Sequence, residues 1–332
     1  MKILNAVGMK KAAVLVCAVF ILAAMACWSA GNAAEKPVRV AYLQNDIHHL
    51  PFWVARDMGF LARQGANVEV AGVFRSGPDI MSAFAAGALD MAYVGVAPAT
   101  AAVANGTADV VVLSQSNAEG SALVVASNGR HLVKTVKDLE GKSVAIPGLS
   151  TVQDFLLKES LTKQGVRLDR VKFLVVKPPE MISALRNGDV DAFIAWEPYP
   201  AKASQMGVGR TLVSSGEMWP GHPCCVVVAD AKFLASHPDQ VNAVLRAHRQ
   251  AVEWIGKNRD KAVDIAVKYT GMDEKTIRSA MKTVHYNPTL DADGVRRYAR
   301  FLTGLGYIRI KDVDGFIGKF VRQESAAQRA GR

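Results

Sequence analysis

The pattern of apolar and polar residues predicts short buried strands that alternate with amphipathic helices. Strands covered on both faces are typical of parallel sheets, and apolar runs of this kind occupy residues 38–43, 68–73, 91–94, 143–146, 171–176 and 192–195. Helical patterns that end in glycine lie between them, at residues 52–64 and 152–164. This alternation predicts an α/β fold with right-handed crossovers.

The sequence repeats itself at an offset of 101 residues. Residues 78–90 and 179–191 both start with a proline followed by an acid, and both keep a serine, an alanine, a glycine and a final aspartate in place. Each copy is typical of a helix with a glycine stop, and an apolar strand follows it. We therefore expect two similar units of the order strand, helix, strand, helix, strand, with chance similarity of two α/β units as the alternative.

The C-terminal third predicts one strand at 225–228 followed by helices. Helical patterns run from 236 to 257, onward from 258, and near 273–284, 291–305 and 312–321, before a polar tail at 323–332. These helices need an apolar partner, so we expect the chain to return to its first lobe near 221–226. The predicted lobes are 38–127 with 226–322, and 128–225, joined by two crossings around a hinged cleft.

The N-terminus has the pattern of a secretory signal peptide over residues 1–34. Three lysines precede an apolar run at 12–26, and small residues follow through Ala34. We expect a periplasmic protein, with a lipid anchor at Cys27 as the alternative. After this segment, no apolar run in the sequence is long enough to cross a bilayer.

Charge and cysteine content narrow the range of partners. The chain has 40 basic and 30 acidic residues, and removal of 1–34 takes away three lysines and no acid, which leaves 37 against 30. The basic residues are scattered among acids, so we expect small anions and no nucleic acid as partners. Of the four cysteines, Cys17 leaves with residues 1–34 and Cys27 leaves with them or carries a lipid, so only the adjacent Cys224 and Cys225 remain, which excludes a disulfide framework.

Four segments carry a resemblance to a known family: residues 52–65, 87–90, 148–151 and 196–198. They are similar to the sulfonate, nitrate and taurine group of ABC-transporter substrate-binding proteins, which has relatives that bind thiamine precursors. The resemblance implies a two-lobed, hinged periplasmic-binding-protein fold of type II. It also implies a monomer without a cofactor that captures a small anionic or zwitterionic solute for an ABC permease and its ATPase.

The candidate ligand-binding residues follow the carboxyl ends of predicted strands, where ligands of open α/β sheets bind. They are Gln44, Asn45, Asp46, His48, His49, Gly95, Val96, Ser150, Thr151, Trp196 and Glu197. Ser150 or Thr151 could cap a helix whose free N–H groups bind an anion. Trp196 could stack on a solute while Glu197 pairs with an ammonium group, as in taurine. The alternatives are a solvated loop, an ordinary helix cap and a turn that braces the hinge.

Three soft donors near the second crossing form a weaker metal candidate: His222, Cys224 and Cys225, with His48 or His49 nearby. Adjacent strand residues point to opposite faces, so we expect ordinary packing and no metal ion. The sequence has no nucleophile elbow, phosphate loop or His-Glu-x-x-His motif, which favours a binding protein over an enzyme. A thiamine-precursor or metal-chelate binding protein, a sensory binding module and a pyrimidine-synthase-like enzyme stay open as alternatives.

Overall fold

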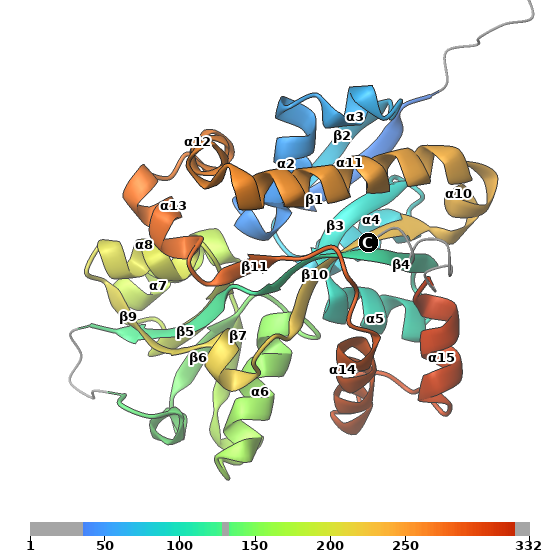
Figure 1. Ribbon diagram of the computed structural model, residues 1–332. Helices are drawn as coiled ribbons and strands as arrows, with labels where there is room; N and C mark the ends of the chain where they lie inside the picture. The colour runs from blue at the N-terminus through green and yellow to red at the C-terminus, as the bar shows by residue number, and fades with distance from the viewer. Residues whose placement is uncertain (1–35, 128–132, 323–332) are drawn as a thin grey trace, which may run out of the picture. The chain divides into compact units, whose positions relative to one another are not determined.

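The computed structural model describes residues 36–127 and 133–322 (Figure 1). From Val38 onward the chain forms one compact unit that contains two β-sheets. The predicted signal peptide, the candidate anchor Cys27 and the polar tail at 323–332 lie outside the described residues. Among the helices that are described, none has the length and apolar character needed to cross a membrane.

The first sheet has six strands in the order β11-β4-β10-β3-β1-β2. They are β1 (Val38–Leu43), β2 (Val68–Phe74), β3 (Met91–Gly95), β4 (Val110–Glu119), β10 (Pro223–Asp230) and β11 (Val284–Tyr286). β1 pairs in parallel with β2 and β3, whereas β10 runs antiparallel between β3 and β4. A strand from the C-terminal third therefore lies inside the sheet that the N-terminal third begins.

The second sheet repeats this arrangement with five strands in the order β7-β6-β8-β5-β9. They are β5 (Ser121–Ala126), β6 (Ser143–Ile146), β7 (Lys172–Val175), β8 (Ala192–Trp196) and β9 (Gly209–Ser214). β6 pairs in parallel with β7 and β8, and β5 runs antiparallel between β8 and β9. The two repeated halves thus occupy equivalent places in two separate sheets.

The chain passes between the sheets earlier than the predicted boundaries at 127/128 and 225/226. It leaves the first sheet at Gly120, because β4 ends at Glu119 and β5 already pairs with β8 and β9. It returns to the first sheet between Ser214, where β9 ends, and Pro223, where β10 begins. The mostly polar residues 114–121 separate the apolar runs 110–113 and 122–126, but β4 continues through this polar segment to Glu119, so the sequence pattern alone did not place the crossing. The division into hinged lobes stays a prediction.

The predicted helices occur in the predicted order with two differences in extent, and short helices at 199–205, 215–218 and 231–236 were not predicted. Those that follow strands of the first sheet along the chain are α2 (Leu50–Asp57), α3 (Phe60–Arg63), α4 (Gly77–Ala85), α5 (Val96–Ala104), α10 (Ala231–Ser236), α11 (Pro238–Lys257), α12 (Arg259–Thr270), α13 (Glu274–Ala280), α14 (Ala292–Gly304), α15 (Val313–Phe320) and the 3-10 turn η1 (Ile47–His49). Those that lie among the strands of the second sheet along the chain are α6 (Val152–Lys163), α7 (Pro178–Asn187), α8 (Tyr199–Gln205), α9 (Ser215–Met218) and the 3-10 turns η2 (Val136–Leu139) and η3 (Leu168–Arg170). The helix expected at 52–64 breaks at Gly59, whose φ is 69°. The helix expected at 273–284 stops at Ala280, and β11 follows.

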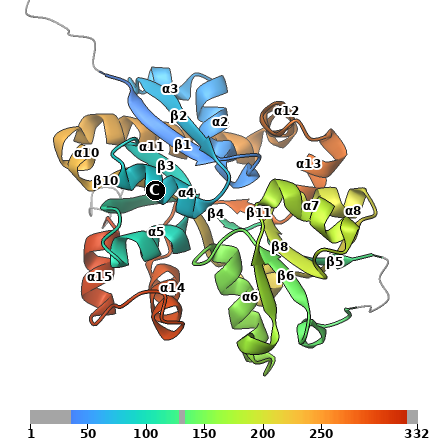
Figure 2. The same ribbon diagram turned by 180° about the vertical axis from the view of Figure 1, so that it is seen from behind.

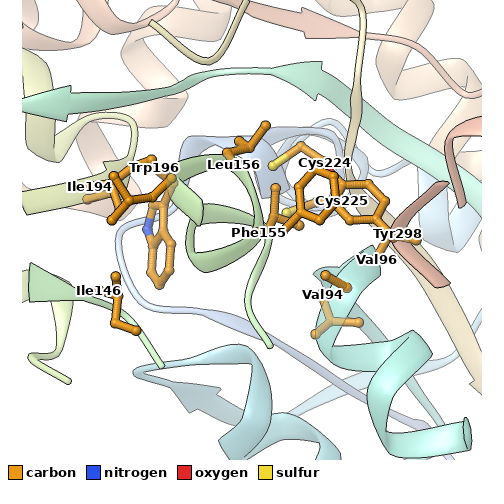
Figure 3. Packing of buried hydrophobic residues seen from close by; sticks show 14 of the residues in the cluster. Val94, Val96, Ile146, Phe155, Leu156, Ile194, Trp196, Cys224, Cys225 and Tyr298 are labelled. Carbon is orange, nitrogen blue, oxygen red and sulfur yellow. The ribbon is translucent and has the colours of Figure 1, made fainter. Parts of the chain in front are cut away.

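Alternate residues of the first sheet supply two apolar cores. In β10, Val227 packs with the core under α2, α11 and α12, while Val226 and Val228 pack on the opposite face with α5 and α14. Helix α11 runs across the first of these faces, and Figure 2 shows α4 and α5 on the other side. The second core continues into the second sheet through Phe155 and Trp196 (Figure 3). The two sheets therefore meet through packed apolar side chains.

Candidate functional site

A small cavity lies where strand ends of both sheets and the starts of two helices come together. We call it the cleft cavity, and it is lined by Leu43, Asp46, Gly77, Gly95, Pro98, Thr151, Val152, Gln153, Trp196, Cys224 and Cys225. The volume that the centre of a water molecule can occupy in this cavity is about 10 Å³. The cavity therefore holds about one water molecule. A larger solute can enter only if the surrounding elements move apart.

The starts of α5 and α6 face each other at this cavity. Gly95 precedes α5, and a side chain added there would lie 3.4 Å from Val152 and 3.3 Å from Pro98. Val96, the first residue of α5, is fully buried. The positive ends of two helix dipoles therefore converge where the cavity lies.

The start of α6 already holds a carboxylate of its own chain. Thr151 caps the helix by accepting a hydrogen bond from the Asp154 N–H at 3.2 Å. Asp154 in turn accepts from the Ser150 N–H at 3.0 Å and pairs with Lys158 at 2.5 Å. Ser150 itself lines a neighbouring hollow of about 360 Å³ and not the cleft cavity. Thr151 and the residues after it are thus better placed for a solute than Ser150.

Trp196 and Glu197 have different surroundings although they are adjacent. Trp196 lines the cleft cavity, and its buried indole N–H has no hydrogen-bond partner among the described residues. The Glu197 carboxylate accepts from the Ala201 N–H at 3.1 Å, and burial raises its pKa to about 7. Glu197 does not line the cavity. The donor of Trp196 is available to a ligand, whereas the carboxylate of Glu197 caps the start of α8.

Gln44 and Asn45 lie beside the cavity without lining it. The Gln44 N–H donates to the Phe74 carbonyl at 2.7 Å, and its own carbonyl accepts from the Tyr199 hydroxyl at 3.5 Å. Asn45 has a positive φ of 52°, which turns the chain into η1. Both residues are half-buried.

Asp46, His48 and His49 are fully buried, which overturns the solvated-loop alternative. Asp46 caps η1 by accepting from the His48 N–H at 3.0 Å. The His48 ring lies with Nδ1 3.3 Å from the Asp46 carboxylate and Nε2 2.8 Å from the Gly120 carbonyl. The segment after β1 thus carries its polar side chains into the protein.

Cys224 and Cys225 point to the same group, contrary to our expectation of opposite faces. Each Sγ lies 3.6 Å from Nδ1 of His48. The pairing of β10 with β4 is irregular on both sides of Cys225, and this bulge turns the two side chains to one side. Figure 3 shows both cysteines beside Phe155 and Tyr298. His222 stays apart, because its Nδ1 faces the Pro223 carbonyl and the Tyr298 hydroxyl, each at 3.2 Å.

These residues form one buried titratable group, the Cys–His cluster of Asp46, His48, His49, Cys224 and Cys225. Burial opposes protonation of His48, but Asp46 and Cys224 outweigh it and raise its pKa to about 9. Burial likewise opposes ionisation of Cys224, yet the Cys225 hydrogen bond and the His48 charge bring its pKa well below the ordinary value. Burial and the neighbouring Cys224 raise the pKa of Cys225. The cluster therefore favours a His48 imidazolium beside a Cys224 thiolate.

The sequence matches the NMT1-like family over residues 31–268. The chain belongs to the NMT1-like family. It is 30% identical over 277 residues to the "Putative aliphatic sulfonates-binding protein" of Bacillus subtilis (strain 168), covering 81% of each chain.

Solved structures of binding proteins share the fold of this NMT1-like chain. The ligand-binding component of an ABC-type import system from Staphylococcus aureus with zinc bound has a TM-score of 0.78 and 18% identity, covering 90% of this chain and 99% of that one. The alkanesulfonate-binding protein SsuA from Xanthomonas axonopodis pv. citri bound to MOPS has a TM-score of 0.75 and 18% identity, covering 88% and 100%. The predicted fold class and family resemblance are confirmed.

Several lining residues of the NMT1-like chain were missed because they carry no obvious chemistry in the sequence. Gly77 and Pro98 are such residues, whereas Gln153 is a buried amide that donates to the Ser121 hydroxyl at 3.0 Å. Gln153 lies two positions after Thr151 in the first turn of α6, so the helix-start argument could have included it. Cys224 and Cys225 were considered only as weak metal candidates.

Proposed function

We propose that this chain is the extracytoplasmic substrate-binding component of an ABC importer, and that its solute is a small anion or zwitterion of the sulfonate class. Membership in the NMT1-like family and the sulfonate-binding relative support the class of solute. The observation that carries the proposal is the unpartnered Trp196 N–H in a cavity where two helices start. A sulfonate oxygen would accept from this donor and from the helix N–H groups.

The site must open to admit a solute, since the cleft cavity holds about one water molecule. Repeat-related positions of the two halves also contact each other: Lys177 donates to the hydroxyl of Ser76, which lies 101 residues before it, at 2.7 Å and pairs with Asp79 at 2.9 Å. Such partly exposed pairs contribute about 0 to 1 kcal/mol each. They are weak enough to break, so we propose that the two sheets move as hinged lobes with the crossing at Gly120 as part of the hinge.

The proposed partners follow from the same role. The relative from Staphylococcus aureus is named as a component of an ABC-type import system, and we propose that this chain passes its solute to an ABC permease with its ATPase. We further propose that it works in the periplasm as a monomer, binds its solute without transforming it, and needs no cofactor for this step.

Calorimetry on ligand-free protein tests the solute. Ethanesulfonate, taurine, nitrate and a pyrimidine thiamine precursor form the panel, and we expect the sulfonates to bind. Trp196→Phe keeps the ring and removes the donor, and it should weaken sulfonate binding about tenfold or more, since a hydrogen bond to a charged group contributes about 1.5 to 3 kcal/mol.

The matched control is Trp53→Phe, because Trp53 is also buried with an unpartnered N–H but does not line the cavity. Trp53→Phe should bind sulfonate with the same affinity as the unaltered protein. If the unaltered protein binds no sulfonate, the proposed solute class is wrong. If both variants lose the same affinity for sulfonate, Trp196 is not part of the binding site.

A further inference from the structure

The Cys–His cluster has donor atoms at the separations that a tetrahedral metal ion requires. With Zn–N of about 2.0 to 2.1 Å and Zn–S of about 2.3 Å, tetrahedral geometry places nitrogen and sulfur about 3.6 Å apart. Nδ1 of His48 lies 3.6 Å from Sγ of Cys224 and 3.6 Å from Sγ of Cys225. The three donor atoms lie within 4.8 Å of one another, and all three residues are buried.

The hydrogen bond of the other His48 nitrogen orients the ring for a metal ion. Nε2 lies 2.8 Å from the Gly120 carbonyl, which can only accept, so Nε2 carries a proton. The neutral ring then presents the lone pair of Nδ1 to the two sulfurs, as metal-binding histidines commonly do. A side chain at position 120 would lie 2.4 Å from Nε2, so this hydrogen bond requires the glycine.

A second set of donors in the cluster is less suitable. Asp46, His49 and Cys225 also lie within 4.8 Å of one another. However, the Leu43 N–H donates to Nδ1 of His49 at 3.1 Å, so the neutral His49 ring carries its proton on Nε2 and has no lone pair there. Asp46 lies 3.3 Å from Nδ1 of His48 and supplies negative charge beside the first set.

We propose that His48, Cys224 and Cys225 form a three-ligand site for a soft divalent metal ion, with zinc as the ion that best fits two sulfurs and one nitrogen. Coordination replaces the proton on Nδ1 of His48 and the thiol proton of Cys225, and both protons pass to solvent. Because Cys224 and Cys225 line the cleft cavity, the proposed metal site lies at the wall of that cavity. The site does not depend on the solute being a sulfonate.

The test uses the exported protein without a histidine tag, reduced and stripped with a chelator. Titration with Zn²⁺ alone against a competing chromophoric chelator should show one equivalent bound. Cys224→Ser, Cys225→Ser and His48→Gln should each weaken this binding at least tenfold. His222→Gln is the matched control, a buried histidine next to the cysteines that the geometry places outside the site, and it should bind zinc unchanged.

A second readout needs no variant. Co²⁺ added to the unaltered protein should give a thiolate-to-cobalt charge-transfer band, which Zn²⁺ then removes. The proposal is overturned if the unaltered protein binds no zinc, if the band is absent, or if folded cysteine variants bind as tightly as the unaltered protein. Sulfonate calorimetry on the zinc-free protein is measured separately, so loss of the metal site and loss of the proposed solute give different results.

Discussion

His248 and His48 are both buried, but their ring nitrogens have different partners. His248 in α11 has both ring nitrogens matched to neutral partners, the Tyr93 hydroxyl at 3.1 Å and the Gln115 carbonyl at 2.9 Å. His48 is equally buried, but it lies among charged and sulfur groups. A buried polar group costs free energy unless it is paired. His248 is a satisfied part of the core, whereas the surroundings of His48 have bonding capacity left for a ligand.

Several buried polar atoms without a hydrogen-bond partner lie in the cleft, whereas none of those in the described part of the chain belongs to His248, Tyr93 or Gln115. Asp46 Oδ2 and His49 Nε2 are buried without a hydrogen-bond partner in the described part of the chain, and so is the Trp196 N–H. Asp46 and Trp196 both line the cleft cavity. Buried polar atoms without partners lower the stability of the folded protein, but they are available to bind a ligand. Among the described residues, the cleft has such atoms, and His248 and its two partners do not.

The largest expected effect is a pH dependence that belongs to His248. Burial lowers its pKa to about 4, so between pH 6.5 and 4 the unfolded chain binds a proton that the folded chain does not. Stability is therefore fully present above pH 6.5 and falls as the pH drops to 4, by about 3 kcal/mol from this group. The buried His49 and His222 also have lowered pKa values, so His248→Gln should remove only the share of His248, and its denaturant unfolding should show a loss about 3 kcal/mol smaller than that of the unaltered protein.

The control for this prediction is zinc binding by His248→Gln at pH 7, which should equal that of the unaltered protein. If the variant retains the full pH dependence, His248 is not the titrating group. If it also loses zinc, the two histidine sites are not independent.

A smaller effect is expected at Thr151, which separates capping from solute binding. Thr151→Ala removes the side-chain acceptor of the Asp154 N–H and should cost about 1 kcal/mol in the free energy of unfolding. We also expect weaker sulfonate binding, because the start of α6 would be less well ordered. Ser150→Ala is the comparison and should have little effect on affinity, since Ser150 lies outside the cavity. If both variants bind sulfonate with equal affinity, the anion does not bind at the start of α6.

The smallest effect on solute affinity is expected at Glu197. Like His248, Glu197 has a structural role. Its carboxylate caps α8 and does not line the cavity. Glu197→Gln should therefore change the affinity for taurine and for ethanesulfonate by less than about twofold. A selective loss for taurine of about 2 kcal/mol or more would show instead that the carboxylate binds an ammonium group. Calorimetry with both solutes distinguishes these results.

Much of the fold follows from local patterns. The apolar runs and glycine stops predicted β1 to β3, β6 to β8 and the helices between them, because these strands are covered on both faces. The sheet to which β5 belongs was not predicted: residues 122–126 form a second apolar run after the mostly polar residues 114–121, and only pairing with β8 and β9 assigns that run to the second sheet.

The candidate site was predictable to the extent that it lies at strand ends. Asp46, Gly95, Thr151 and Trp196 were expected there and do line the cavity. The joint orientation of Cys224 and Cys225 was not predictable, because it depends on a bulge that forms where β10 pairs with β4. Asn117 in β4 holds the bulge by accepting from the Cys225 N–H at 3.2 Å, a contact between residues 108 positions apart.

Native mass spectrometry of the freshly exported protein tests most directly whether the unmatched groups of the cleft bind ligands. We predict the mature chain with a mass increment for one zinc ion and a second increment for one small organic anion. Addition of Zn²⁺ and ethanesulfonate to stripped protein should restore both increments. The mass of the bare chain, before and after this addition, would contradict the account.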